Sequence, residues 1–168
     1  DAQAVLDARI KKLTNSLSPL VADAESTHGD LLDRLTADIG CSPRALAAAL
    51  LRVVNGGLFL FHGLVKVFVF TIPGTVGYFE SIGLPGFLAY VVIVAELAGG
   101  IALIAGFQTR IVALALSVIL LGSIYTPHFS AGFLFSNPNG GWEFPAFWAL
   151  TLWALALLGD GAYAVTKR

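Results

Sequence analysis

Six ionisable side chains lie inside or directly beside apolar stretches of this 168-residue sequence, where they could perform chemistry. They are Arg52, His62, Lys66, Glu96, His128 and Glu143. Ionisable groups at bilayer depth are costly, so they usually face the protein interior and mark sites or proton paths. Histidine and carboxylate side chains can also exchange protons with a bound molecule. We therefore expect any function to depend on where these six residues meet.

The first apolar stretch carries its polar residues on one face. A repeated spacing of three and four residues relates Arg52, Asn55, Phe59, His62 and Lys66. That spacing places side chains on a single stripe of a helix. The outer part of the stripe, His62 and Lys66, is expected on the same side of the membrane as His128 and Glu143. These four residues form our candidate polar pocket, which could bind a carbonyl or quinone oxygen and move a proton.

A purely structural interpretation of the same four residues stays open. Lys66 could extend its amino group to the membrane surface, Glu143 could cap a helix, and His128 could contact lipid headgroups. Each residue alone fits that interpretation well. The presence of four such residues on one side favours a site, for which no catalytic residue can be assigned.

A second prediction concerns Arg52 and Glu96. Counted from the cytoplasmic ends of their helices at about 1.5 Å per residue, both lie roughly 10–15 Å deep. We therefore predict an intramembrane Arg52–Glu96 ion pair, because a lone charge there would cost several kcal/mol. Such a pair could serve function or only fix the register of the two helices.

Metal and haem chemistry find little support in the sequence. A single cysteine, Cys41, excludes an internal disulfide and a thiolate metal cluster, so no metal site is expected. His62 and His128 could in principle share a haem, but His128 follows Pro127 at a helix end while His62 lies two turns inside the membrane. We therefore expect no haem and no covalently bound cofactor, with a quinone as the candidate ligand.

The elements that would position these residues are four apolar spans. We predict helices over residues 45–70, 87–106, 110–125 and 144–158, with glycine- and proline-rich segments between them. The segments 71–86 and 127–142 are predicted loops, and 107–109 is a tight turn. The fold class is all-α: an integral membrane four-helix antiparallel bundle over residues 45–168.

Residues 1–44 form a different kind of segment. They hold twelve of the twenty-one charged residues, although 57% of the whole chain is hydrophobic and only 12% charged. Leu6, Ile10, Leu13 and Leu17 form one apolar stripe, and Leu31, Leu32, Leu35 and Ile39 form another. Pro19 is expected to separate two amphipathic helices of a cytoplasmic or interfacial arm. The arm could be a solvated hairpin, lie on the membrane, or contact other membrane subunits.

Charge placement predicts the orientation and the partners. Lysine and arginine lie in the arm, at Arg110 and at the C-terminal Lys167 and Arg168, whereas the predicted loops 71–86 and 127–142 contain none. Both termini are therefore expected in the cytoplasm. No basic patch indicates nucleic acid, so the expected partners are the bilayer and other proteins. The lack of methionine, at position 1 included, leaves open whether the chain is complete at its N-terminus.

Several short motifs resemble those of the DoxX family of small four-helix membrane proteins. In chain order they are Leu51-Arg52, Phe59 to Lys66, Tyr78-Phe79, Gly83-Leu84-Pro85, Glu96 to Gly100, Gly106 to Arg110, His128 with Gly132-Phe133, Gly140 to Glu143, and Gly159-Asp160-Gly161. The resemblance covers about residues 45–165 and leaves the arm outside. It implies a location in the bacterial cytoplasmic membrane and a link to quinone-coupled oxidoreduction, without an agreed list of catalytic residues.

Two functions follow as hypotheses. The first is an accessory membrane subunit of a quinone-linked redox or electron-transfer complex, which contacts a lipid-soluble carrier and is not catalytic alone. The alternative is a non-catalytic structural subunit or assembly factor of a larger membrane complex, docked through residues 1–44. Transport of a small solute is disfavoured, because the sequence shows neither inverted repeats nor interrupted helices.

Overall fold

The computed structural model describes residues 2–166, except for some side chains in the first helix. Those excepted are Ala2, Ala4, Leu35, Thr36, Asp38 and Ile39. The described residues form helices and no strand, which confirms the all-α prediction. Contacts divide the chain into two units, Asp1–Pro43 and Arg44–Arg168, each of which is described by itself.

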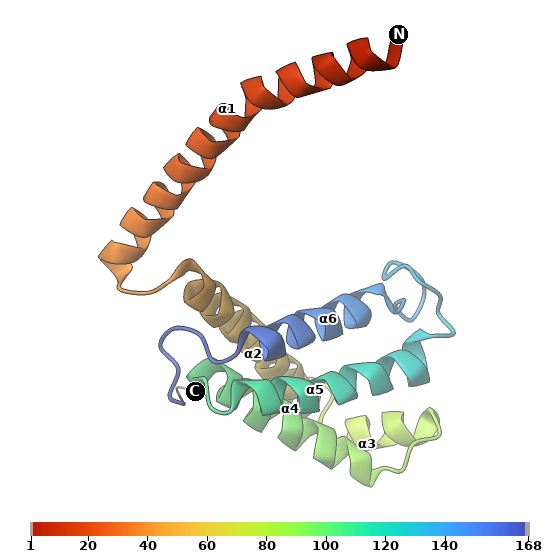
Figure 1. Ribbon diagram of the computed structural model, residues 1–168. Coiled ribbons are helices and arrows are strands. Elements are labelled where there is room, and N and C mark those ends of the chain that lie inside the picture. The colour runs from red at the N-terminus through yellow and green to blue at the C-terminus, as the bar shows by residue number, and fades with distance from the viewer. Residues whose placement is uncertain (1, 167–168) are drawn as a thin grey trace. The chain divides into compact units, whose positions relative to one another are not determined.

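The N-terminal unit is one long helix, α1 (Ala2–Ile39), of 38 residues. It continues through Pro19, so the predicted break at this proline is wrong (Figure 1). A proline inside a helix removes one backbone hydrogen bond and can bend the helix without ending it. Of the second predicted stripe, the side chains of Leu35 and Ile39 lie outside the described residues.

The second unit contains the four predicted apolar helices. They are α2 (Pro43–Phe68), α4 (Phe87–Ala105), α5 (Thr109–Ser123) and α6 (Glu143–Leu158). Among the described residues, three helical stretches are long and apolar enough to cross a membrane: Pro43–Phe68, Phe87–Ala105 and Thr109–His128. Helix α6 is apolar but shorter. The prediction of four complete crossings therefore stays a prediction.

The third span reaches this length because helical structure continues past Pro127. A π-helical segment, η1 (Ile124–His128), follows α5 directly. The Phe129 backbone N–H donates to the Ile124 carbonyl at 2.8 Å, and this wider turn accommodates the proline inside it. The helix end predicted before Pro127 is therefore three residues too early.

A short helix that the sequence did not predict follows α2. Helix α3 (Ile72–Ser81) replaces part of the predicted loop 71–86 and packs on α4. The Thr71 hydroxyl accepts a hydrogen bond from the Gly74 N–H at 3.3 Å, and Pro73 lies in the first helical turn. Both features are typical of helix starts. Gly74 and Gly77 made this segment resemble a loop, but packing against α4 outweighs their low helix propensity.

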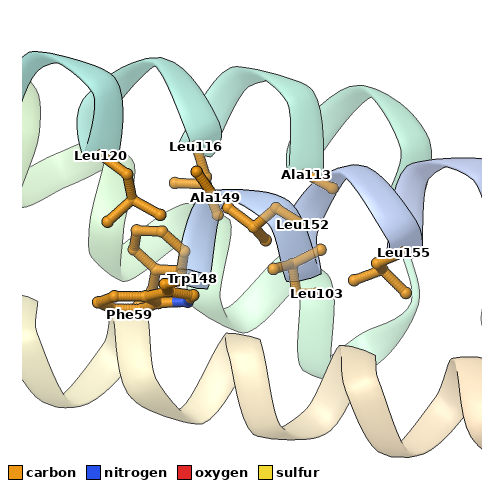
Figure 2. Close-up of a cluster of buried hydrophobic side chains, with 9 residues drawn as sticks. All are labelled: Phe59, Leu103, Ala113, Leu116, Leu120, Trp148, Ala149, Leu152 and Leu155. Atoms are coloured by element: carbon orange, nitrogen blue, oxygen red, sulfur yellow. The ribbon is translucent and has the colours of Figure 1, made fainter. Parts of the chain in front are cut away.

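The core lies where α2, α4, α5 and α6 meet. Its buried members, drawn in Figure 2, are Phe59, Leu103, Ala113, Leu116, Leu120, Trp148, Ala149, Leu152 and Leu155. Helix α5 packs on both α4 and α6 (Figure 1). Helices α2 and α4 approach at Gly56 and Gly100, where a Cβ on Gly56 would lie 2.7 Å from the Gly100 carbonyl oxygen. Only a residue without a side chain permits this contact.

The chain after α6 folds back onto the ends of α2, α4 and α5. The Ala162 N–H donates to the Ala45 carbonyl at 2.8 Å, and the Thr166 N–H donates to the Gly106 carbonyl at 3.1 Å. The Asp160 carboxylate accepts from the Thr109 N–H at 3.2 Å and so caps the start of α5. These bonds fasten the C-terminal segment, residues 159–166, to the helix ends.

Candidate functional site

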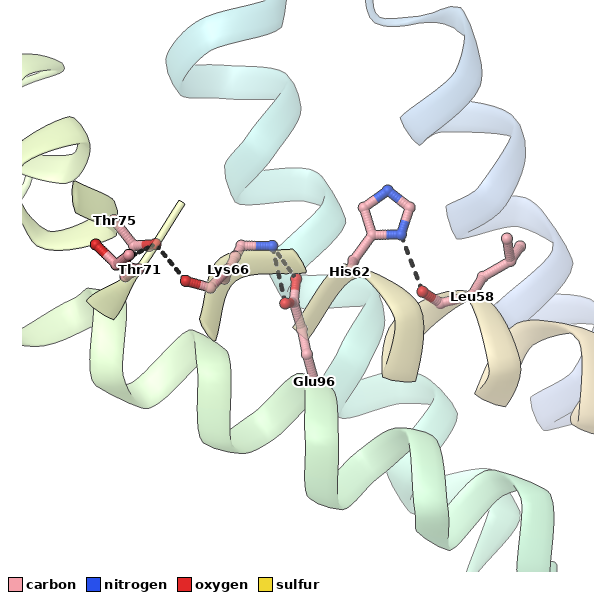
Figure 3. A network of polar contacts seen from close by, with 6 residues as sticks. All are labelled: Leu58, His62, Lys66, Thr71, Thr75 and Glu96. Atoms are coloured by element: carbon pink, nitrogen blue, oxygen red, sulfur yellow. Dashed lines mark hydrogen bonds and ion pairs between the residues drawn. The ribbon is translucent and has the colours of Figure 1, made fainter. Parts of the chain in front are cut away.

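The two charges that meet inside the bundle are Lys66 of α2 and Glu96 of α4. The Lys66 Nζ lies 2.9 Å from Oε1 and 2.8 Å from Oε2 of Glu96, so it donates to both carboxylate oxygens (Figure 3). The side chain of Glu96 is 6% exposed and that of Lys66 is 19% exposed. A pair this buried is held by attraction at low dielectric and by the cost of leaving either charge alone.

The pair lies at the midpoint of an apolar helix. Glu96 is nine residues from each end of α4 (Phe87–Ala105), or about 14 Å at 1.5 Å per residue. Lys66, by contrast, is two residues from the end of α2. Helix α2 therefore ends near the middle of α4, where it brings a cation to the most deeply placed carboxylate.

The end of α2 is held by the hydroxyl group of Thr75, which lies in the first turn of α3. The Thr75 hydroxyl lies 3.1 Å from the Lys66 carbonyl and 3.0 Å from the Thr71 carbonyl (Figure 3). Thr71 has a φ of 64°, a conformation in the left-handed region that a threonine rarely adopts. Carbonyl groups at a helix end need a partner away from water. The turn at Thr71 and the start of α3 supply one, and they thereby hold Lys66 in place.

His62 lies one turn before Lys66 and faces α6. Its Nδ1 lies 2.9 Å from the Leu58 carbonyl, so Nδ1 carries the donor hydrogen and Nε2 is left to accept or donate. The ring is half-buried, and its centroid is 5.1 Å from that of Trp148. Trp148 also packs on Phe59 at 4.4 Å. The buried Trp148 indole N–H has no hydrogen-bond partner within the described chain.

The predicted Arg52–Glu96 ion pair is wrong, because Glu96 binds Lys66 instead. The sequence argument aligned the cytoplasmic ends of α2 and α4, but the N-terminal part of α2 lies beyond the C-terminal end of α4. Arg52 lies level with Gly106, immediately after the C-terminal end of α4, where its guanidinium occupies the space that a Gly106 side chain would need. Arg52 is thus about 15 Å along the axis of α4 from Glu96.

Arg52 has a different role at the end of the bundle. Its Nη2 donates to the Ala162 carbonyl at 3.0 Å, and the Asp160 carboxylate interacts with it electrostatically. The residue is only 2% exposed. Arg52 therefore holds the C-terminal segment against α2, which is a structural task.

His128 and Glu143 serve the loop between α5 and α6. The His128 Nδ1 lies 2.8 Å from the Gly140 carbonyl, and the Glu143 Oε1 accepts from the Phe135 N–H at 2.9 Å. No hydrogen bond or ion pair between described residues links them to His62 or Lys66. The four residues of the candidate polar pocket therefore divide into a loop pair and a bundle pair. The site that remains is His62, Lys66 and Glu96.

Sequence reasoning missed the Lys66–Glu96 pair, the role of Trp148 and the hydroxyl groups of Thr71 and Thr75. The nearest signal lies in the glycines of α2, because Gly56 approaches Gly100 and Gly63 approaches Leu97 and Glu96. Small residues permit close approach of membrane helices. A strict antiparallel register through Gly56 and Gly100 would nevertheless place Lys66 level with Tyr90, so the glycines alone do not predict its pairing with Glu96. The contact of Trp148 with His62 depends on how α6 packs on α2. The contacts of the Thr71 and Thr75 hydroxyl groups depend on the turn after α2, which no residue spacing indicated.

No metal-binding group is apparent in this arrangement. Within residues 2–166, no three or more histidine, cysteine, aspartate or glutamate side chains are grouped to hold a metal ion. The site contains a buried lysine–glutamate ion pair and an imidazole beside an aromatic ring.

An all-α fold with apolar helices of bilayer length and a buried ion pair defines a small integral membrane protein. The chain belongs to the DoxX family, whose pattern matches residues 47–129, a range that includes the bundle site. The resemblance found in the sequence is thereby confirmed.

Two bacterial relatives support the assignment. "Putative oxidoreductase CatD" of Bacillus subtilis is 40% identical over 115 residues, which cover 68% of this chain and 81% of that protein. "Inner membrane protein YqjF" of Escherichia coli is 30% identical over 124 residues, covering 69% of this chain and 86% of that protein. No solved structure matches the chain.

Proposed function

We propose that this protein is an accessory membrane subunit of a quinone-linked redox complex and contacts a lipid-soluble carrier at His62, Lys66 and Glu96. One observation carries the proposal: a lysine–glutamate pair lies at the midpoint of an apolar helix, with a histidine one turn away. Buried charges of this kind are retained at a cost, and in membrane helices they commonly mark proton or ligand paths.

The chemistry of these residues suits a quinone headgroup. A quinone carries two carbonyl oxygens on a flat ring and exchanges protons when it is reduced or oxidised. With the Nδ1–H of His62 donating to the Leu58 carbonyl, Nε2 of the neutral ring can accept from a quinol hydroxyl, and Nε2 of the protonated ring can donate to a quinone oxygen. The Trp148 ring offers an aromatic surface beside it. Lys66 and Glu96 can hold and release a proton between them. The name of the Bacillus relative, "Putative oxidoreductase CatD", agrees with this chemistry.

Location and orientation are part of the proposal. The Escherichia relative is named an inner membrane protein, and we propose the bacterial cytoplasmic membrane for this chain as well. The distribution of lysine and arginine supports an orientation with both termini in the cytoplasm.

A structural subunit or assembly factor is the second candidate, and one observation favours it. The Lys66 amino group already donates to both Glu96 oxygens, so the pair is satisfied without a ligand. In that case the pair would only fix how α2 and α4 pack.

Purification from native membranes in a mild detergent separates the two functions. We expect mass spectrometry to find a redox enzyme and a quinone with the wild-type chain. A His62→Ala variant should keep the protein partner and lose the quinone. The His62 side chain donates to the Leu58 carbonyl of its own helix, so its removal breaks no hydrogen bond to another helix. Recovery of only non-redox partners, with no quinone in either preparation, would support the structural role and contradict the proposal.

A further inference from the structure

The arm α1 carries an apolar seam with the periodicity of a coiled coil. Successive intervals of four and three residues relate Leu6, Ile10, Leu13, Leu17, Leu20, Ala24, Thr27 and Leu31. The repeat is 3.5 residues and lasts for 26 residues, or more than three and a half heptads. Such a repeat keeps a narrow seam facing a second helix along a supercoil. The six large seam residues are 50–65% exposed.

A membrane surface fits this seam poorly. Interfacial helices usually have a wide apolar face and a polar face rich in lysine and arginine. Here the apolar seam takes two positions in seven, and the helix contains six acidic and four basic residues. An acidic helix is repelled by anionic lipid headgroups. A second helix is therefore the better occupant.

We propose that the arm pairs with the arm of a second copy of this chain as an antiparallel two-stranded coiled coil over residues 6–31. Side-chain size supports this orientation. An antiparallel register that pairs Leu6 with Leu31 also pairs Ile10 with Thr27 and Leu13 with Ala24, so each layer with a small residue also has a large one. A parallel pair would instead stack Ala24 on Ala24 and Thr27 on Thr27 in consecutive layers and leave a gap.

Charge placement supports the same orientation. In the antiparallel register, Arg9 flanks the seam opposite Asp30 of the second copy, and Asp7 lies opposite His28 of the second copy. Each contact occurs twice in the symmetric dimer. In a parallel pair Arg9 would face Thr14, which offers no charge. Residues that flank a coiled-coil seam set the orientation of the helices in this way.

Pro19 is compatible with the pairing. It lies two residues after Leu17 and one before Leu20, on the outer side of the seam, where the missing N–H and the ring face away from the second helix. The bend it introduces falls near the centre of the dimer, between the two Leu17–Leu20 layers. Both helices would thus bend at the same point.

Disulfide trapping in membranes that contain the full chain tests the proposal. In a Cys41→Ser background, Leu6→Cys and Leu31→Cys are placed on two differently tagged copies and oxidised. We expect a crosslink between the two tags. A matched pair on the outer face, Ala8→Cys and Gly29→Cys, has the same register and should not crosslink. Crosslinks of Leu6→Cys only to itself would show a parallel pair and overturn the orientation. No crosslink at any seam position would overturn the pairing.

A charge exchange provides an independent readout. Arg9→Asp should reduce the crosslink yield several-fold, because it places two acidic groups opposite each other. Adding Asp30→Arg in the same chain should restore the yield, since the pair is re-formed with its signs exchanged. A yield that falls further in the double variant would contradict the antiparallel register. This inference does not depend on the proposed redox function.

Discussion

Lys66 and Glu96 are the residues on which the bundle site depends. Each would be an isolated charge among apolar helices without the other, and each is held at hydrogen-bond distance by its partner. A buried pair adds little stability relative to two apolar residues, but a broken pair costs about 3–5 kcal/mol. The pair should therefore act as one unit when it is mutated.

A double-mutant cycle measures that coupling. Lys66→Met and Glu96→Leu should each lower the free energy of unfolding by about 3–5 kcal/mol, because a buried charge loses its partner. The double variant should lose clearly less than the sum. Reversible unfolding in mixed micelles gives the values, with Lys12→Met on the exposed arm as a control expected within about 0.5 kcal/mol of wild type. Strictly additive losses would show that the two side chains do not interact.

At the residue scale the sequence predicted which charges matter and mispredicted one partner. The sequence marks His62, Lys66 and Glu96 as ionisable groups at depth. A count of depth pairs Glu96 with Arg52, because it treats the cytoplasmic ends of α2 and α4 as level. Helix α2 has 26 residues and α4 has 19, and no feature of either sequence alone says where one lies along the other.

At the scale of elements, the contact between α2 and α4 depends on two glycines. Gly56 and Gly100 face each other so closely that a Cβ on either would lie within 2.8 Å of the other's carbonyl oxygen. Together with the approach of Gly63 to Leu97 and Glu96, this contact holds α2 against α4 where Lys66 can reach Glu96. The site therefore depends on a packing contact ten residues away from its lysine.

Neighbouring glycines on α2 allow a matched test. Gly56→Ala should destabilise the protein by about 1–3 kcal/mol, because the added methyl group meets backbone that cannot move freely. Gly57→Ala, one residue later, meets no atom within 4 Å and should be neutral or slightly stabilising, since alanine favours helix. Thermal unfolding in detergent measures both. Equal effects of the two substitutions would exclude close packing at Gly56.

Helix ends and turns were the elements that the sequence predicted least well. The four apolar helices begin and end within about two residues of prediction, apart from the extension of α5 into η1. Helix α3 was missed because Pro73, Gly74 and Gly77 are typical of loops. Pro19 was expected to end a helix that in fact continues. For α3 the local signal is outweighed by packing on α4, and a proline inside a helix does not have to end it.

At the scale of the whole molecule, the single cysteine provides a probe of orientation without any mutation. Cys41 is partly exposed and lies between α1 and α2. With the N-terminus in the cytoplasm, a membrane-impermeant maleimide should label Cys41 in inverted vesicles and not in intact spheroplasts. Asn139→Cys in a Cys41→Ser background should give the opposite result. Labelling of Cys41 from the outside would reverse the proposed orientation.

The sequence predicted the class of molecule well, because apolar length, charge asymmetry and family motifs all indicated a small helical membrane protein. It could not predict how the C-terminal segment fastens the bundle. That arrangement depends on Arg52 reaching the Ala162 carbonyl across 110 residues of chain. Contacts of this kind follow from the packed bundle and have no signature in local spacing.

Quinone binding to the purified chain tests the central claim most directly. In nanodiscs, with Trp142 and Trp153 replaced by phenylalanine, the fluorescence of Trp148 is titrated with decylubiquinone. We predict saturable quenching that His62→Ala removes, because the His62 ring lies 5.1 Å from Trp148. His128→Ala should retain the quenching, because the His128 ring hydrogen-bonds to the Gly140 carbonyl of its own loop. Quenching that never saturates, or that is the same in wild type and His62→Ala, would contradict a quinone site at His62, Lys66 and Glu96.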